Sequence, residues 1–454
     1  MVRCFSVLTL TEAAEQLRSR RLSPVELTRE CLARIERLNP GLNAFITVTA
    51  DLALKQARNA ESEISAGKYR GPLHGIPVGL KDLFDTAGVL TTAASNQYRD
   101  RVSTEDAEVV RRLKQAGAVI VGKLNLHEFA FGVSGVISAF GPTRNPWNLE
   151  RISGGSSSGS AAAVAAGLCV AALGTDTAGS FRCPSALCGI VGHRPSAGLI
   201  SLKGVVPLST SFDTAGPLAA TVRDAATLID ALVQKSGLAA LLDENVARLK
   251  VGIPRKAFFE NLDPEVTSCL ATAMQVVGKL TSQVRAVEIA VDGFRTIFDA
   301  EIYEYHEAMV ANSPQLYDPR TLYRIQRCVG ITASQYIRER RRLAEFRRAA
   351  EQIFEQVDVV ISPTVPVPAP RIAEVEALAM ADVRPFEVKN LLRNTSPFSV
   401  MFWPTTSVPC GFTRDGLPVG MQISGRPGAD STTLRLAHAY EQATESHKRR
   451  PLQK

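Results

Sequence analysis

The feature that most restricts how this chain can fold is a glycine- and serine-rich stretch that runs directly into a run of alanines. Residues 153–160 read SGGSSSGS, and residues 161–167 read AAAVAAG. Alanine has the highest helix propensity, serine is a favoured N-cap residue, and glycine is common just after a helix ends. The pattern therefore predicts a loop leading into a helix that ends near Gly167, rather than a flexible linker. Such a junction points backbone N–H groups and the positive end of the helix dipole at an anion.

A phosphate-binding loop is one interpretation of this junction. That loop requires a lysine followed by serine or threonine at its end, to reach the phosphates and a magnesium ion. Gly159, Ser160 and Ala161 stand in the corresponding place. The sequence therefore disfavours a nucleotide site and favours a hydrolase loop.

A second small-residue turn follows a predicted strand, and residues 173–182 read LGTDTAGSFR. Ala178 and Gly179 allow consecutive backbone N–H groups to converge, and converged donors that face a serine hydroxyl form an oxyanion hole. Ser180 is therefore a candidate nucleophile. The alternative is that Ser180 only caps or stabilises the turn, which is the more common role of a turn serine.

A serine nucleophile needs a base that accepts its proton. No histidine stands in a recognisable triad context, and no Gly-x-Ser-x-Gly elbow surrounds Ser180. The histidines are His74, His127, His193, His306, His438 and His447. Lys81 is a second candidate, because it lies in an otherwise apolar, strand-like run at 75–85. A lysine that points into the core loses its charge near neutral pH and can act as a base, whereas one that reaches water cannot.

Alternation of short β-branched runs with helical stretches predicts an α/β fold. A helix at 104–116 followed by a strand at 118–121 is one example, and residues 11–66 have a helical pattern. The proline Pro24 after Ser23 marks a helix start. Further strands are expected at 169–173, 250–253, 358–362, 405–408 and 420–424. Because these strands are far apart in the sequence, we expect a mixed sheet assembled from distant segments.

The net charge of +7 raises the question of nucleic-acid binding. Much of the excess lies in residues 338–348, where glutamates and apolar residues recur at helical spacing. This pattern is typical of a solvated helix face. We therefore expect no nucleic-acid partner.

Cysteine usage and apolar runs exclude several further classes of protein. The 8 cysteines form no Cys-x-x-Cys pair and have no zinc-type histidine partner, so neither a metal site nor a disulfide framework is expected. The longest apolar run, 161–173, is interrupted by Gly167 and is shorter than the ~20 residues of a membrane-spanning helix. The first ten residues lack the pattern of a secretory signal. We expect a cytoplasmic protein without a membrane partner.

The segments around Lys81, residues 154–157 and residues 174–180 together resemble the amidase signature family. This family includes fatty acid amide hydrolases, bacterial amidases, allophanate hydrolases and the amidase subunit of glutamyl-tRNA amidotransferases. The resemblance spans about residues 71–224 and is weaker at 358–370 and 407–441. It implies the amidase-signature fold, an α/β architecture whose large mixed central β-sheet is covered by helices on both faces.

The resemblance also assigns roles to residues. The family's Ser–cis-Ser–Lys triad corresponds to Lys81 as base, Ser156 as relay after a cis peptide bond, and Ser180 as nucleophile, with Ser157 and Ser158 as second choices for the relay. The oxyanion-hole donors are the N–H groups of Thr177, Ala178, Gly179 and Ser180. Phe129, Ala130, Gly132 and Val133 correspond to a wall beside the acyl site. Ala178 and Ser158 replace glycines of the common pattern.

The implied activity is hydrolysis of amides, including aryl or acyl amides and carbamates, through an acyl-enzyme and without a cofactor. The alternative is the amidase subunit of a glutamine-dependent tRNA amidotransferase, although the central segment lacks the glutamine-binding pattern expected there. A small-molecule substrate is the expected partner, and a homodimer is left open. The implied organisation is one amidase domain over 1–454, with a helical segment at 1–66, the signature core at 71–224, a variable helical segment lining the substrate site at 292–354, and a C-terminal part of the core at 358–445.

Overall fold

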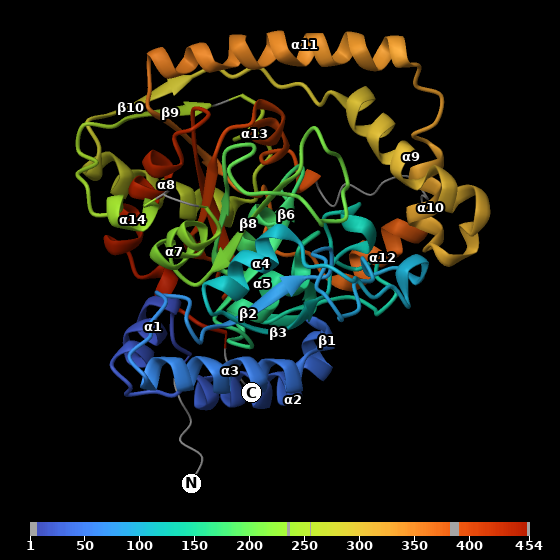
Figure 1. Ribbon diagram of the computed structural model, residues 1–454. Coiled ribbons are helices and arrows are strands. Elements are labelled where there is room, and N and C mark those ends of the chain that lie inside the picture. The colour runs from blue at the N-terminus through green and yellow to red at the C-terminus, as the bar shows by residue number, and fades with distance from the viewer. Residues whose placement is uncertain (1–6, 234–236, 255, 382–389, 452–454) are drawn as a thin grey trace.

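A large mixed β-sheet forms the centre of the molecule (Figure 1). The computed structural model describes residues 7–233, 237–254, 256–381 and 390–451. Over these residues the strand order of the 11-stranded sheet is β1-β3-β2-β6-β8-β7-β12-β13-β11-β9-β10. The neighbours β3, β2 and β6 are parallel, the strands from β6 through β8, β7, β12 and β13 to β11 are antiparallel, and β11, β9 and β10 are parallel.

The strands of the main sheet are β1 (Phe45–Val48), β2 (Pro77–Lys81), β3 (Val119–Leu124), β6 (Ala171–Asp176), β7 (Val191–Arg194), β8 (Thr214–Ala219), β9 (Lys250–Pro254), β10 (Gln283–Val287), β11 (Val359–Pro363), β12 (Thr405–Phe412) and β13 (Pro418–Gly425), and the short strands β4 (Arg144–Asn145) and β5 (Asn148–Ile152) pair apart from it. The helices are α1 (Leu10–Arg18), α2 (Pro24–Leu42), α3 (Ala50–Ser65), α4 (Glu108–Gln115), α5 (Ser158–Ala165), α6 (Arg182–Cys188), α7 (Val222–Leu232), α8 (Pro264–Leu280), α9 (Arg295–Asn312), α10 (Pro319–Gln326), α11 (Ala333–Glu351), α12 (Ile372–Ala381), α13 (Ser396–Met401) and α14 (Asp430–Gln442).

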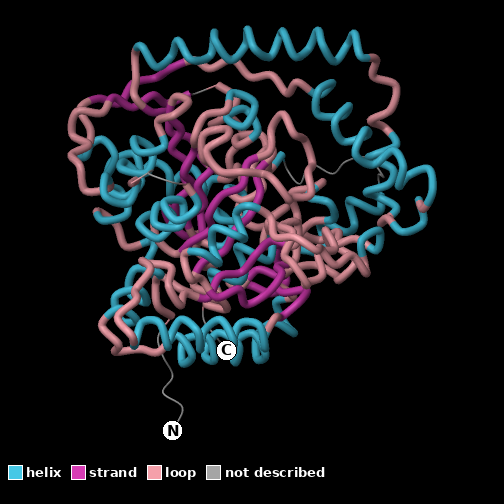
Figure 2. The backbone as a smooth tube through the Cα atoms, in the orientation of Figure 1, coloured by secondary structure: helices cyan, strands magenta, loops and turns pink. Residues whose placement is uncertain are grey.

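Helices cover both faces of the sheet because alternate residues of a strand point to opposite sides. In β6, Ala171 and Leu173 join a core with α4, α7, α8 and α14, whereas Ala172 joins a second core with α3 and α5. Figure 2 shows the strands enclosed between helices in this way. The predicted α/β class, with a mixed sheet covered on both faces, is confirmed.

The local predictions agree with the structure at most positions. All six strands expected from short apolar runs are present as β3, β6, β9, β11, β12 and β13. Ser23 caps α2 and accepts from the N–H of Glu26, while the Glu26 carboxylate accepts from the Ser23 N–H. The predicted helix at 104–116 begins only at Glu108.

The helical pattern at 11–66 hides one strand, β1. Phe45 of this strand pairs with Leu124 of β3 in antiparallel register. The strand has only four residues, so its two-residue period is lost among the surrounding helical residues, and the open edge of β3 decides its conformation.

The central helical segment at 292–354 is confirmed as helical, since α9, α10 and α11 lie within it. In Figure 1, α9 and α10 lie at one side of the molecule and α11 crosses its outer edge, far from α2 and α3. Among the described residues no helix has both the length and the apolar character needed to cross a membrane.

Candidate active site

Two neighbouring parallel strands bring the predicted base and the predicted nucleophile to the same edge of the sheet. Val78 of β2 pairs with Ala171 of β6, so the carboxyl ends of these strands lie together. Lys81 is the last residue of β2, and Ser180 lies in the turn that follows β6. Ser156 reaches the same place from the loop before α5. This edge of an open α/β sheet is where such folds place their ligands.

Lys81 and Ser156 are in direct contact. Lys81 Nζ lies 2.8 Å from Ser156 Oγ and 2.8 Å from Thr175 Oγ1. The side chains of Lys81 and Ser156 are fully buried. Burial lowers the pKa of Lys81 to about 7, against the opposing effect of the Asp213 and Asp176 carboxylates. A substantial fraction of this lysine is therefore a neutral amine at neutral pH, able to accept a proton.

Backbone hydrogen bonds hold the loops of the two serines together. The N–H of Ser157 donates to the Ser180 carbonyl at 2.9 Å, and the N–H of His127 donates to the Ser156 carbonyl at 3.1 Å. The peptide bond between Gly155 and Ser156 is cis, as the resemblance implies. Ser180 is 6% exposed, and its hydroxyl makes no hydrogen bond to another described residue.

The second choices for the relay point elsewhere. Ser157 Oγ donates to the Thr175 carbonyl at 3.1 Å, and Ser158 Oγ lies 3.1 Å from Thr143 Oγ1. Among the described residues, the hydrogen bonds of Lys81 Nζ go to Ser156 and Thr175 and not to these two hydroxyls. Ser157 also precedes α5 without a capping side-chain hydrogen bond, so the expected serine cap of this helix is wrong. Its hydroxyl bonds the neighbouring strand end instead.

The turn after β6 offers three unoccupied amide groups of the four predicted for the oxyanion hole. The Gly179 N–H already donates to Asp176 Oδ1 at 2.7 Å. No described residue accepts from the N–H groups of Thr177, Ala178 or Ser180. Gly179 has φ of +138°, and a Cβ there would lie 2.1 Å from Thr395 Oγ1, so only glycine fits. Ala178 does not have a positive φ, so its methyl group causes no backbone strain.

Asp176 anchors this turn through two buried guanidinium groups. Arg182 donates to both of its carboxylate oxygens at 3.0 Å, and Arg194 Nη1 lies 3.0 Å from Oδ1. All three side chains are fully buried. Burial would raise the pKa of Asp176, but Arg182 and Arg194 outweigh it and hold the pKa far below its usual range. Asp176, Arg182 and Arg194 therefore form one buried charge cluster beneath the turn.

The segment predicted as a substrate wall lies partly against the Ser156 loop. A Cβ on Gly155 would lie 3.0 Å from the Gly135 nitrogen and 3.3 Å from the Val133 carbonyl carbon, so these backbones are in contact. A Cβ on Gly132 would lie 2.2 Å from His127 Nε2. Ala130 is buried with φ of +58°.

The Phe129 ring packs among aromatic side chains. It is fully buried, with ring centroids 4.7 Å from His306 and 5.7 Å from Tyr317. Phe129 therefore joins the wall segment to α9 and to the residues just before α10 through its ring.

Among the described residues, no histidine side chain hydrogen-bonds Ser156 or Ser180; His127 hydrogen-bonds the Ser156 loop only through its backbone N–H. His127 is the histidine beside the Ser156 loop, and its Nδ1 accepts from the Gly135 N–H at 3.3 Å. Burial, reinforced by the positive charges of Arg324 and Arg320, lowers the pKa of His127 to about 3. The ring is neutral, and its hydrogen bond holds the backbone at Gly135, just after the wall segment.

Sequence reasoning missed Thr175 and Asp213. Thr175 lies inside the second small-residue turn and could have been examined as a neighbour of Lys81 once β6 was placed. Asp213 precedes β8, and its Oδ1 accepts from Thr177 Oγ1 at 2.5 Å. No local pattern marks Asp213, because the contact joins residues 36 positions apart.

Comparison with known proteins identifies relatives over nearly the whole chain. The family model described as Amidase matches residues 26–434. A glutamyl-tRNA(Gln) amidotransferase subunit of Roseiflexus sp. (strain RS-1) is 37% identical, over 98% of this chain and 98% of the relative. The solved structure of the corresponding amidotransferase subunit from Thermotoga maritima is 33% identical, with a TM-score of 0.77 over 96% of this chain and 95% of the other. The structure of 6-aminohexanoate cyclic dimer hydrolase complexed with substrate is 28% identical, with a TM-score of 0.88 over 98% of both chains.

These relatives overturn one expectation. The sequence argument expected no nucleic-acid partner, because the basic run at 338–348 is typical of a solvated helix face. Relatives that match 98% of the chain are named as a subunit of an amidotransferase of glutamyl-tRNA(Gln), so the expectation is wrong. The charge pattern of one helix indicates only whether that helix is solvated, and it carries no information about what a larger assembly binds.

Proposed function

Since this chain belongs to the amidase signature family, we propose that it cleaves the carbon–nitrogen bond of an amide through an acyl-enzyme on Ser180, with Lys81 as base and Ser156 as relay. The observation that carries the proposal is the 2.8 Å contact between the buried Lys81 Nζ and Ser156 Oγ. A neutral amine can accept the proton of the serine hydroxyl that it contacts, and that serine can then accept the proton of the next serine.

The first half of the reaction transfers the acyl group to the protein. Lys81 accepts the Ser156 proton, Ser156 accepts the Ser180 proton, and Ser180 Oγ attacks the carbonyl carbon. The N–H groups of Thr177, Ala178 and Ser180 are the candidates to bind the oxyanion, and each such donor lowers the barrier by about 3 kcal/mol. As the carbon–nitrogen bond breaks, the relay returns the proton to the leaving nitrogen.

The second half regenerates the serine. Water attacks the ester carbonyl, and the same relay accepts its proton. The tetrahedral intermediate then collapses, releasing the carboxylic acid and returning a proton to Ser180 Oγ. Each group ends in its starting protonation state, so the chain's own residues suffice for the cycle.

The substrate we favour is the side-chain amide of glutamine, with this chain as the amidase subunit of an amidotransferase complex. The support is the name of the curated relatives, which are 35–38% identical to this chain over 97–98% of its length. In such a complex the released ammonia would pass to a partner subunit.

A second candidate is an independent hydrolase of small amides, including aryl amides or carbamates. The TM-score of 0.88 to 6-aminohexanoate cyclic dimer hydrolase exceeds the 0.77 to the Thermotoga maritima amidotransferase subunit, so the backbone is more similar to an enzyme that acts on a small cyclic amide. This observation favours the second candidate.

We further propose one amidase domain, in which the helical segment at 292–354 covers the acyl side of the site. The contact of Phe129 with His306 and Tyr317 supports this arrangement, because it ties the wall segment to α9 and to the residues just before α10.

One assay separates the two substrates. The purified chain would be supplied with L-glutamine, with p-nitroanilides of increasing acyl length and with one aryl carbamate, and ammonia or amine release measured. Release from glutamine supports the first candidate, and release only from anilides or the carbamate supports the second. Full turnover of any substrate by Ser180→Ala would refute the proposed nucleophile.

A further inference from the structure

A run of hydrogen bonds joins the outer helices α9 and α11 to the turn before Ser180. It begins at Thr177, one of the candidate oxyanion-hole residues, whose hydroxyl donates to Asp213 Oδ1 at 2.5 Å. The second oxygen of Asp213 accepts from the N–H groups of Leu208 and Ser209 at 2.9 and 3.1 Å. Asp213 therefore closes its own loop, residues 208–213, and fixes Thr177 to it.

The same loop is held from outside by Glu301 of α9. Ser209 Oγ donates to Glu301 Oε2 at 2.5 Å, and the Ser211 N–H donates to the same oxygen at 3.0 Å. Ser211 Oγ donates to Glu301 Oε1. The carboxylate side chain is only 10% exposed, so these bonds are poorly replaced by water.

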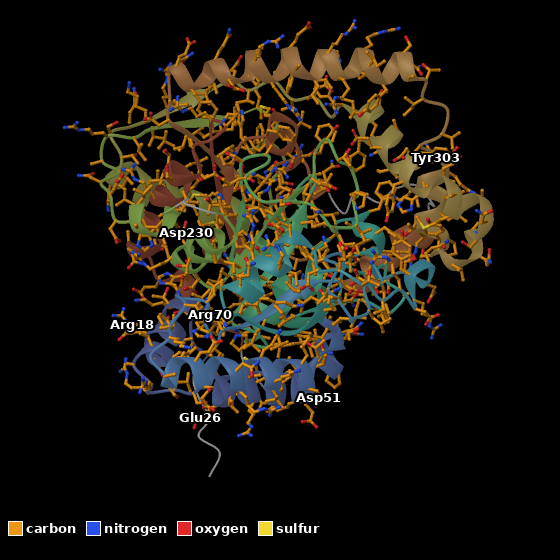
Figure 3. All side chains as sticks on the ribbon, in the orientation of Figure 1. Arg18, Glu26, Asp51, Arg70, Asp230 and Tyr303 are labelled. Atoms are coloured by element: carbon orange, nitrogen blue, oxygen red, sulfur yellow. The ribbon has the colours of Figure 1, made fainter. Side chains whose placement is uncertain are left out.

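Helix α11 completes the environment of Glu301. Tyr336 OH donates to Glu301 Oε1 at 2.7 Å, and Arg340 Nη1 lies 3.7 Å from the same oxygen. Arg340 also donates to Ser211 Oγ. Leu343 is the one buried residue of α11 among the described side chains, and other side chains of this helix extend from its outer side in Figure 3.

Both oxygens of Glu301 thus face donors only, and these donors come from two separate parts of the chain. We propose that Glu301 is a positioning residue, which fixes the loop at 208–213 between α9 and α11 and, through Asp213 and Thr177, orients the amide donors next to Ser180. This inference rests on the proposed function. It explains why a carboxylate in the variable helical segment is directed at the catalytic edge of the sheet.

The expected effect is on the chemical step rather than on substrate binding. Donors in an oxyanion hole act on the charge that develops in the transition state, so a displaced Thr177 lowers kcat and leaves KM nearly constant. In Glu301→Gln the amide NH₂ must face donors, so one set of bonds to Ser209 or Ser211 is lost. We expect kcat about tenfold lower and KM within about twofold of the wild type.

The test compares the full-length wild type with Glu301→Gln and with Glu304→Gln, an exposed acid on the same helix that serves as the matched control. The probe is L-glutamine or the p-nitroanilide that the wild type hydrolyses fastest. Rates are divided by the concentration of active sites titrated with a fluorophosphonate, so that misfolded molecules do not count. Glu304→Gln is expected to retain wild-type kcat. A kcat of Glu301→Gln within twofold of the wild type overturns the proposal.

A double-mutant cycle tests the route through Thr177. Thr177→Val removes the hydroxyl that bonds Asp213 and keeps the backbone N–H. If Glu301 acts through Thr177, the double variant is no slower than the slower single variant, whereas independent effects multiply. Multiplying effects overturn the route. Tyr336→Phe, which removes one donor to Glu301, replaces Glu301→Gln if that variant does not fold, with about a threefold loss of kcat expected.

Failure of the inference is distinguishable from failure of the proposed function. If Ser180→Ala is inactive and Glu301→Gln turns over normally, only the positioning role is wrong. If Ser180→Ala remains active, the nucleophile itself is misassigned.

Discussion

Lys81 Nζ and Ser156 Oγ lie 2.8 Å apart, and neither side chain is exposed to solvent. In water a lysine amine is protonated until about pH 10, and a serine hydroxyl beside it has no acceptor. Burial lowers the pKa of Lys81 to about 7, so the neutral Lys81 amine can accept the proton of the Ser156 hydroxyl. The proposed chemistry depends on this pair.

Replacing the two serines is expected to have unequal effects. Ser180→Ala removes the atom that would form the acyl-enzyme, so we expect turnover to fall at least about 10³-fold. Ser156→Ala removes the relay but leaves the nucleophile, so a slow residual activity is expected. Mass spectrometry after a rapid quench would detect an acyl adduct on Ser180 in the wild type. An adduct on another residue would contradict the assignment.

The activity is expected to rise with pH through the neutral range. Lys81 must be neutral to accept a proton, and its pKa is about 7, so kcat/KM should increase as pH rises through about 7 and level off above. Asp213 raises the pKa of Lys81, as Asp176 also does. Asp213→Asn should therefore move the acid limb to lower pH while Asp176 still acts. A limb that stays in place in this variant would show that a different group titrates.

The two buried lysines of this region are expected to respond differently to removal of the charge. Lys81→Met should lower kcat/KM by about 10²–10⁴-fold with little loss of stability, because no carboxylate is left unpaired. Lys123 forms a fully buried ion pair with Asp82 at 3.0 Å, so Lys123→Met should lower the free energy of unfolding by about 3–5 kcal/mol. Urea unfolding and steady-state kinetics measure both. Equal losses of stability would assign Lys81 a structural role.

The turn before Ser180 should tolerate a substitution of Ala178 but not one of Gly179. In Gly179→Ala the new methyl group would meet Thr395 Oγ1 at 2.1 Å in a backbone with φ of +138°, so the free energy of unfolding should fall by at least about 1–3 kcal/mol and kcat with it. Ala178→Gly is the control, with a cost of about 1 kcal/mol or less. Thermal unfolding and kcat would be measured for both. Wild-type stability of Gly179→Ala would mean that Thr395 can move aside.

Local sequence signals predicted much of this fold. Ser23, Pro24 and Glu26 define the start of α2, because a cap depends on residues only three positions apart. Gly167 follows α5 in the left-handed region, as expected of a residue that ends a helix. The short apolar runs predicted the central strands, because a strand that is buried on both faces needs a continuous apolar segment.

Signals of this kind failed where a distant part of the chain decides the outcome. The strand β1 exists because β3 has a free edge to pair with, and its four residues carry too little pattern to show it. Phe129 is packed against His306 and Tyr317, which lie in a distant part of the sequence. None of these contacts has a counterpart in the spacing of nearby residues.

The sequence by itself determined which residues are available for the chemistry: a lysine at the end of an apolar strand, a serine in a glycine-rich loop and a serine in a small-residue turn. Only the tertiary structure decided that Lys81 is buried against Ser156, that Asp213 opposes the fall of the lysine pKa and that Glu301 reaches the loop beside Thr177. The reason is physical. Residue type and backbone preference act over a few neighbouring positions, whereas burial and electrostatic surroundings depend on segments that are brought together only when the sheet is assembled.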